Sequence, residues 1–466
     1  MIKENLSNKN LSNKDSSNTR TKTAILLLND LLREDFEPII DNIEFKENLV
    51  VITNVRIDKK KYGINLIFDR LDDTKNLLQK LRVLQSKDNL DFCGIIGLDE
   101  EYNYAISEAI AKEFGLKCNS RKTLDTISNK YLQIEALKDG GVDVPQFKYV
   151  DDYEGSKDFR MPCVIKPVKG ISSLHVYKIN DSDELKTIFR RLDSYKSETF
   201  LSLTNQSNST QSSRTISTNK NKRLNTNKRF ILEEFIDGNE YSCDFLVGKD
   251  ILLLRVVKKI TSKQYFPFFE GLYLFNPDES KTSEFSSGYL KDVCKRIAKS
   301  LNITTGLCMV DFRFDAKRNK IIVIETTTRP GVDDFTLLMK KNYDYISMSI
   351  ALRNIFGTLD VNSFQKIPEG NSVLIYLTAP KSGILKRFDT TKLEKLKLDG
   401  LNSSGGIARH NILKLVKYNK AGDKIDYLGL LKNPPYIGHI IIDDIRAEDI
   451  DGTIEKIKSN IDVKME

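Results

Sequence analysis

The feature that most constrains the fold is a pair of apolar runs in the later half of the chain, separated by a short polar turn. Residues 308–314 and 321–325 have the length of β-strands, and the polar segment 315–320 lies between them, a pattern that predicts a β-hairpin. Asp311 lies within the first run and Glu325 ends the second. Because opposed residues on antiparallel strands face the same side, these two carboxylates could meet across the hairpin.

Two neighbouring carboxylates repel each other unless a cation lies between them. Mg²⁺ binds one or two carboxylates together with substrate phosphates, which makes the hairpin a candidate metal site. Arg329 follows Glu325 by four residues and precedes Pro330-Gly331, so its guanidinium could lie next to such a metal. The alternative is that the two acids are solvent-facing strand residues, and the hairpin alone does not decide between these interpretations.

Composition and cysteine usage indicate an ordinary globular protein. The chain has 466 residues, 40% hydrophobic and 30% charged, which is enough for two to four structural units. The N-terminus has no apolar core segment and no apolar run is long enough to cross a bilayer, so we expect a cytoplasmic protein with no membrane partner. The six cysteines form no C-x-x-C pair and the three histidines are far apart, which predicts reduced thiols and argues against a zinc site.

The net charge of +8 is concentrated in two polar segments. Residues 1–22 contribute +3 and residues 201–229 contribute +6, so the rest of the chain carries −1. The folded part is therefore close to neutral, which argues against a nucleic-acid partner. Because both segments are too polar to pack into a core, we expect a disordered N-terminal tail and a disordered insert.

Strand and helix patterns alternate in the first part of the chain, which predicts a parallel, Rossmann-like sheet at residues 23–119. No G-x-G-x-x-G sequence follows the first strand, so nothing there indicates a dinucleotide. A second unit begins at Ser128, a candidate N-cap for a helix that contains Lys130 and stops at Gly140. Residues 359–466 are expected to form a small C-terminal α/β unit.

Several charged residues in the middle of the chain are candidates for nucleotide contacts. Lys130 opens a predicted helix and Lys166 ends a predicted strand, and two such cations beside a serine-containing turn would suit a triphosphate. Glu233, Glu234 and Glu240 surround a turn, where backbone groups could contact adenine and a later carboxylate could bind ribose hydroxyls. Each residue taken alone is better explained as a solvated surface charge.

Taken in order, these motifs resemble the ATP-grasp superfamily and, within it, the carboxylate–amine ligases, many of which join amino acids. The resemblance rests on Lys130, Val164-Ile165-Lys166-Pro167, the segment 231–240, Asp311 and Glu325-x-x-x-Arg329-Pro330-Gly331. It covers residues 130–331 and extends more loosely to both ends. The implied fold class is α/β, in detail an α+β ATP-grasp fold. It comprises the Rossmann-like N-terminal domain, a two-lobed ATP-grasp domain at residues 120–358 that includes the insert, and the C-terminal unit.

The resemblance also implies cofactors and site residues. The cofactors are ATP and Mg²⁺, with Mn²⁺ as a substitute. Lys130 and Lys166 are the implied phosphate contacts. Glu233, Glu234 and Ile236 are the implied contacts at the adenine edge, and Glu240 is the implied ribose contact. The implied metal ligands are Asp311, Glu325 and Thr327, and the implied catalytic residues are Arg329 and Lys166. The implied reaction is phosphorylation of a carboxylate by ATP, followed by attack of an amine on the acyl-phosphate, which a planar guanidinium can steady.

The chain departs from the family pattern in two places. The third metal ligand is usually Asn, whereas this chain has Thr327, a poorer Mg²⁺ ligand that puts the second metal in doubt. The loop over the phosphates has Leu174-His175 where small residues are usual, so Ser172 and Ser173 are expected to make the contacts. These departures favour one alternative, an ATP-binding protein with lost or weak turnover. A second alternative keeps the fold and changes the chemistry, to a biotin-carboxylase-like or purine-pathway enzyme. The identities of the carboxylate and the amine, and the oligomeric state, stay open.

Overall fold

The computed structural model describes most of the chain after the polar N-terminus. The described residues are 20–28, 33–55, 59–68, 73–97, 104–170, 176–194, 230–260, 271–276, 278, 283–331, 335–361, 372–393, 411–425, 436–443, 445 and 450–466. The predicted insert, nearly all of the predicted tail, and the predicted phosphate contacts Ser172 and Ser173 lie outside these residues. Across these ranges, no helix has the length and apolarity needed to span a bilayer.

The N-terminal unit is a four-stranded parallel sheet, as its alternating pattern predicted. In the order β3-β2-β1-β4, its strands are β1 (Thr21–Leu27), β2 (Leu49–Thr53), β3 (Asn65–Phe68) and β4 (Leu90–Gly97). Its helices are α1 (Arg33–Asn42), η1 (Lys46–Asn48), α2 (Lys59–Tyr62), α3 (Thr74–Lys87) and α4 (Tyr104–Phe114). Helices α3 and α4 cover one face, and the other face packs on α1 and on later helices, so the central strands are buried on both sides.

The next unit, which we call the small lobe, contains a four-stranded antiparallel sheet in the order β5-β8-β6-β7. Its elements are α5 (Arg121–Ile127), α6 (Lys130–Asp139), β5 (Phe147–Val150), β6 (Cys163–Pro167), β7 (Tyr177–Ile179), α7 (Ser182–Ser194) and β8 (Phe230–Glu234). The prediction that Ser128 caps the helix of Lys130 is wrong. Ser128 ends α5, and the Asn129 side chain instead accepts hydrogen bonds from two amides in the first turn of α6. Both residue types are good N-caps, so the sequence did not distinguish these adjacent positions.

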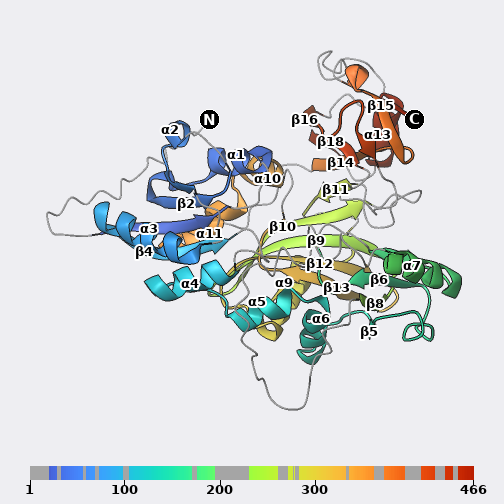
Figure 1. The fold of residues 1–466 in the computed structure, drawn as a ribbon, viewed down its shortest axis with the longest axis horizontal. Helices are drawn as coiled ribbons and strands as arrows, with labels where there is room; N and C mark the ends of the chain where they lie inside the picture. The colour runs from blue at the N-terminus through green and yellow to red at the C-terminus, as the bar shows by residue number, and fades with distance from the viewer. Residues whose placement is uncertain are drawn as a thin grey trace.

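An eight-stranded antiparallel sheet forms the centre of the molecule (Figure 1). In the order β13-β12-β9-β10-β11-β14-β18-β16, its strands are β9 (Asn239–Val247), β10 (Ile251–Ile260), β11 (Gly271–Leu274), β12 (Gly306–Asp315), β13 (Lys320–Thr327), β14 (Ser372–Thr378), β16 (Asn411–Lys417) and β18 (Tyr436–Asp443). The helices that pack on it are α9 (Ser287–Ser300), α10 (Phe335–Tyr343) and α11 (Ser347–Phe356). One of its apolar faces therefore joins the core of the N-terminal unit through α10 and α11.

The predicted hairpin is present as β12 and β13, with Asp311 opposite Glu325. Three C-terminal strands, β14, β18 and β16, belong to the same central sheet, because β14 pairs with β11. Further elements near the C-terminus are the strands of a three-stranded sheet, β15 (Gly383–Asp389), β17 (Lys424–Ile425) and β19 (Asp462–Met465), and the helix α13 (Ile450–Ser459). The predicted C-terminal unit is thus hydrogen-bonded into the central sheet, and the exact domain boundaries stay predictions.

Candidate nucleotide and metal site

The two carboxylates of the hairpin lie side by side on β12 and β13. Asp311 and Glu325 are direct partners in the antiparallel ladder, and a register shift follows Asp311. Lys259 Nζ lies 2.7 Å from Asp311 Oδ2. Asp311 Oδ1 is buried and has no hydrogen-bond partner among the described residues. A buried carboxylate oxygen without a donor carries a desolvation cost, which a bound cation would offset.

Lys130 reaches the hairpin from the first turn of α6. Its Nζ lies 2.5 Å from Glu325 Oε1 and 2.9 Å from the Gly170 carbonyl oxygen, and its amide donates to the Val168 carbonyl. Burial raises the pKa of Glu325, but Lys130 and Lys166 outweigh burial, so the pKa lies below its ordinary value. Glu325 is therefore ionised at neutral pH.

Lys166 and Glu233 form a buried ion pair between β6 and β8. Lys166 Nζ lies 2.8 Å from Glu233 Oε1, and their side chains are 5% and 4% exposed. Lys166 Nζ also lies 3.4 Å from the Ile324 carbonyl oxygen in the hairpin. Burial raises the pKa of Glu233. Lys166 opposes this rise and the nearby Glu325 carboxylate adds to it, so the pKa lies above its ordinary value. The small lobe therefore brings Lys130 and Lys166 together at the carboxylate end of the hairpin.

Glu240, at the start of β9, lies between two cations. Lys259 Nζ is 2.9 Å from Glu240 Oε1, and Arg313 Nη2 is 2.7 Å from Oε2. Burial raises the pKa of Glu240, but Lys259 and Arg313 outweigh burial and hold the pKa below its ordinary value. Because Lys259 also binds Asp311, it links the predicted ribose contact to the predicted metal ligand.

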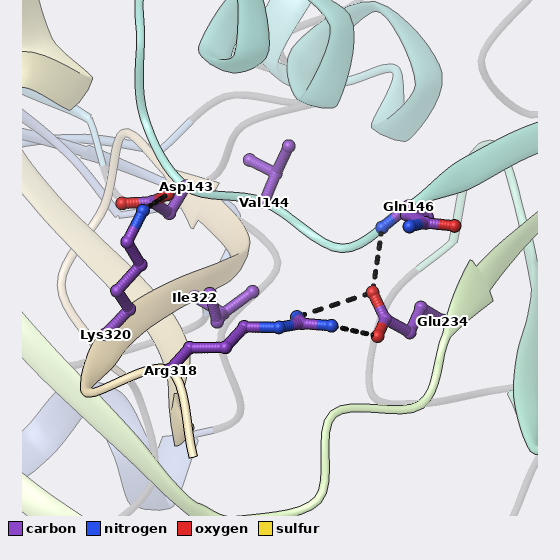
Figure 2. A pocket seen from close by; sticks show the side chains of 7 residues that line it. All are labelled: Asp143, Val144, Gln146, Glu234, Arg318, Lys320 and Ile322. Atoms are coloured by element: carbon purple, nitrogen blue, oxygen red, sulfur yellow. Dashed lines mark hydrogen bonds and ion pairs between the residues drawn. The ribbon is translucent and has the colours of Figure 1, made fainter. Parts of the chain in front are cut away.

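The predicted adenine contacts lie at the junction of β8 and β9: Glu234 ends β8, and Ile236 lies in the linker that follows. Arg313 Nη1 donates to the Ile236 carbonyl oxygen at 3.1 Å. Because successive side chains of a strand face opposite sides, the Glu234 side chain lies on the other face of β8 from Glu233. It binds Arg318 and accepts a hydrogen bond from the Gln146 amide at 3.4 Å (Figure 2). It belongs to a cavity that we call the outer pocket, lined by Asp143, Val144, Gln146, Glu234, Arg318, Lys320 and Ile322. Any adenine contact of Glu234 must therefore come from its backbone.

Thr327 and Arg329 follow the second carboxylate of the hairpin. The buried Thr327 hydroxyl donates to the Arg329 carbonyl oxygen at 3.3 Å, and Arg329 Nη1 donates to the Pro330 carbonyl oxygen at 3.2 Å. The Gly331 amide donates to Asp244 Oδ1 at 2.9 Å. The hydroxyl proton of Thr327 is thus directed at the turn that carries Arg329, and the hydroxyl oxygen keeps its acceptor capacity.

The donor set fits Mg²⁺. Asp311 and Glu325 supply two carboxylates from adjacent strands, and one oxygen of Asp311 is buried without a donor. Mg²⁺ takes one or two carboxylates and completes its shell with substrate phosphates and water. Within the ranges that the structure describes, no cluster of three or more Asp, Glu, His or Cys residues forms a metal site. A metal here would accordingly depend on nucleotide oxygens for its other ligands.

Reasoning from the sequence missed Lys259 and Arg313, the two cations that hold Glu240. Arg313 lies inside an apolar strand run in β12, whereas Lys259 follows Lys258 near the end of β10. A charge inside such a run is the signal that could have found Arg313, because buried charges require partners. Asp244 in β9 and Arg255 in β10 carry the same signal, and they form a two-point ion pair at 2.8 and 2.9 Å.

Comparison with known proteins identifies the domain that contains most of these residues, although Lys130 precedes the matched range. Residues 159–336 match the family model of an ATP-grasp domain. A D-alanine–D-alanine ligase of Neisseria meningitidis serogroup A is 24% identical over 210 residues, which cover 43% of this chain and 57% of that ligase. The chain thus spans 57% of the length of the first curated relatives that it matches.

Two solved structures share the fold over nearly the whole chain. An L-amino acid ligase from Bacillus licheniformis has a TM-score of 0.68 at 18% identity, covering 97% of this chain and 100% of that one. The biotin carboxylase domain of the Hydrogenobacter thermophilus 2-oxoglutarate carboxylase, solved with MgADP and bicarbonate, has a TM-score of 0.57 at 12% identity, covering 95% and 91%. The resemblance in the sequence motifs is confirmed at the level of the domain: residues 159–336 of this chain form an ATP-grasp domain.

Proposed function

We propose that this chain is an ATP- and Mg²⁺-dependent ligase that phosphorylates a carboxylate and joins it to an amine, supplied by an amino acid. The observation that carries the proposal is the approach of Lys130 and Lys166 from the small lobe to the paired carboxylates Asp311 and Glu325. Two cations and two acids at one lobe junction suit a triphosphate and its metal. The names of similar proteins, D-alanine–D-alanine ligase and L-amino acid ligase, support amino-acid substrates.

In this proposal the chain's own groups bind and orient the nucleotide. Lys130 and Lys166 bind phosphate oxygens, and Glu240 accepts hydrogen bonds from the ribose hydroxyls. Glu234 and Ile236 present backbone groups to the adenine edge. Ser172 and Ser173 stay predicted phosphate contacts.

The reaction has two steps. In the first step, an oxygen of the substrate carboxylate attacks the γ-phosphorus of ATP and the bond to the β–γ bridging oxygen breaks. ADP departs and an acyl-phosphate is formed. The amine nitrogen then attacks the acyl carbon, inorganic phosphate leaves with the electrons of the C–O bond, and the nitrogen loses a proton to become an amide. Arg329 steadies the acyl-phosphate through its planar fork. Asp311 and Glu325 would hold Mg²⁺, with Thr327 as the predicted third ligand. When bound, the metal supplies neutralisation of the phosphate charge.

The test is Mg²⁺-dependent release of ADP and phosphate in the presence of pooled amino acids and small carboxylates, repeated with Mn²⁺. We expect substrate-stimulated turnover in the wild type and a fall of about 10²–10³-fold in Glu325→Gln, because charge neutralisation at the phosphates is lost. The matched control is Asp143→Asn, which removes an acid that binds Lys320 at 2.7 Å in the outer pocket. Turnover in this control should stay at the wild-type level.

Other outcomes would redirect the proposal. ATP hydrolysis that requires bicarbonate or formate would indicate the biotin-carboxylase-like or purine-pathway alternative. Tight ATP binding without turnover against any pool would indicate a nucleotide-binding protein. In that case Thr327→Asn, which restores the usual amide ligand of the family, is the variant to test for recovered turnover.

A further inference from the structure

A fully buried ion pair, Asp244 with Arg255, lies in the middle of the central sheet. Their side chains are 1% and 0% exposed, and Arg255 Nε and Nη2 lie 2.8 and 2.9 Å from the two carboxylate oxygens. The proposed reaction does not use this pair. Burial of two charges has a large desolvation cost, so the pair is weak evidence for a purely stabilising role.

Asp244 also holds the turn that follows the hairpin. Its Oδ1 accepts a hydrogen bond from the Gly331 amide at 2.9 Å, two residues after Arg329. Burial raises the pKa of Asp244, whereas Arg255, the Gly331 amide and Arg329 lower it. The charge of Arg329 therefore acts on the same carboxylate that anchors its turn.

The strands around the pair leave its carboxylate little freedom. Asp244 pairs with Arg255 across β9 and β10, and with Met309 across β9 and β12. Next to Arg255 in β10, the Leu254 carbonyl accepts a hydrogen bond from Tyr345 Oη at 3.0 Å. The acceptor of the Gly331 amide is thus held on the middle one of three paired strands.

We propose that Asp244 and Arg255 are positioning residues for Arg329. Arg255 fixes the Asp244 carboxylate through a two-point fork, and Asp244 fixes the Gly331 amide and with it the turn that presents Arg329 to the acyl-phosphate. The inference rests on the proposed function, in which Arg329 is catalytic. Misplacement of a catalytic group by about 1 Å costs about 10²-fold in rate, so the anchor influences chemistry without touching the substrate.

The variant Asp244→Leu/Arg255→Met replaces the pair by apolar side chains. Such replacement of a complete buried pair often leaves stability unchanged, whereas removal of one partner does not. It removes the acceptor for the Gly331 amide. The matched control is Glu44→Leu/Arg353→Met, which removes another two-point pair, at 2.6 and 2.7 Å, between the N-terminal unit and α11.

Hydrogen exchange at the Gly331 amide measures the anchor without any need for activity. With selective ¹⁵N-glycine labelling, this amide should be protected in the wild type although it lies outside the strands. The Asp244→Leu/Arg255→Met variant should speed its exchange at least about tenfold, and the control variant should not. Unchanged exchange at Gly331 in a folded double variant overturns the proposal. If the double variant does not fold, the wild type alone decides: a Gly331 amide that exchanges as fast as an exposed loop amide overturns the proposal.

Kinetics test the consequence of the anchor. The double variant should lower kcat at least about tenfold and keep the ATP Kd within about twofold. Introduced into the Arg329→Ala variant, it should lower kcat by less than a further factor of about two. Additive losses in that background, or equal weakening of ATP binding, would show a general structural role and overturn the proposal. Absence of wild-type turnover with every substrate pool would reject the proposed function, and exchange at Gly331 would still decide whether the pair anchors the turn.

Discussion

Glu233 and Glu234 are neighbours on β8, yet their side chains face opposite sides of the same lobe. Glu233 faces inward and pairs with Lys166, and both side chains are almost completely buried. Glu234 faces the outer pocket and binds Arg318, whose side chain is 42% exposed (Figure 2). The strand therefore separates a buried set of charges, close to the hairpin carboxylates, from an exposed set behind it.

Ion-pair length does not distinguish the two sets, whereas the burial of their cations does; the acids Glu325 and Asp143 are similarly exposed, at 32% and 30%. Lys130 lies 2.5 Å from Glu325 on the inner side, and Lys320 lies 2.7 Å from Asp143 on the outer side. The two lysine side chains are 11% and 48% exposed. Because buried charges are costly and exposed pairs contribute little, we infer that the inner charges are retained for a ligand and that the outer pairs only join the lobes.

The largest expected effect on stability is that of Lys166→Met, which leaves Glu233 buried without its partner. We expect the free energy of unfolding to fall by about 3–5 kcal/mol, measured by urea denaturation. The double variant Lys166→Met/Glu233→Leu should recover most of this loss, because no unpaired charge is left. A loss below about 1 kcal/mol in the single variant would contradict the distinction between the two sets.

A smaller effect concerns pH, and two buried acids of the inner set should respond with opposite signs. The pKa of Glu240 is held down by Lys259 and Arg313 against burial, so its contribution is present at neutral pH and is lost as the pH falls below the unfolded value of 4.5. Burial raises the pKa of Glu233, so its charged form destabilises the fold as the pH rises through that value.

The corresponding measurement is the free energy of unfolding between about pH 7 and about pH 3.5. Glu240→Gln should flatten the loss of stability on acidification, whereas Glu233→Gln should steepen it. Parallel pH profiles for the two variants would show that the opposite environments of these acids are not as described.

The smallest effects are expected for the outer pocket. Arg318→Met and Lys320→Met should each change the free energy of unfolding by less than about 1 kcal/mol, because their ion pairs are exposed. The effect should shrink further in about 1 M salt, where exposed charges are screened. A loss above about 2 kcal/mol from either variant would place the outer set among the structurally essential charges.

The hairpin and its opposed acids could be predicted because the information is local. Two strand-length runs and one polar turn set the register that brings Asp311 to Glu325. The parallel N-terminal sheet was equally predictable from alternating strand and helix patterns. The order of the motifs along the chain was enough to relate Lys130 and Lys166 to a known family.

Features that depend on distant partners could not be predicted in the same way. Strands β11 and β14 are separated by nearly 100 residues in sequence, and nothing local indicates that the C-terminal strands extend the central sheet. The roles of Lys259 and Arg313 likewise became clear only when the strands that carry them were placed beside Glu240. For the helix of Lys130, two good N-cap residues stood side by side, and the structure uses the second.

The most direct test of the account is the dependence of nucleotide binding on Mg²⁺ at the paired carboxylates. Isothermal titration would compare ADP binding with Mg²⁺ and with a chelator, in the wild type, in Asp311→Asn and in the control Asp143→Asn. The account predicts at least about tenfold tighter binding with Mg²⁺ in the wild type and the control, and loss of that gain in Asp311→Asn. Equal affinity with and without Mg²⁺ in the wild type, or a full gain in Asp311→Asn, would contradict it.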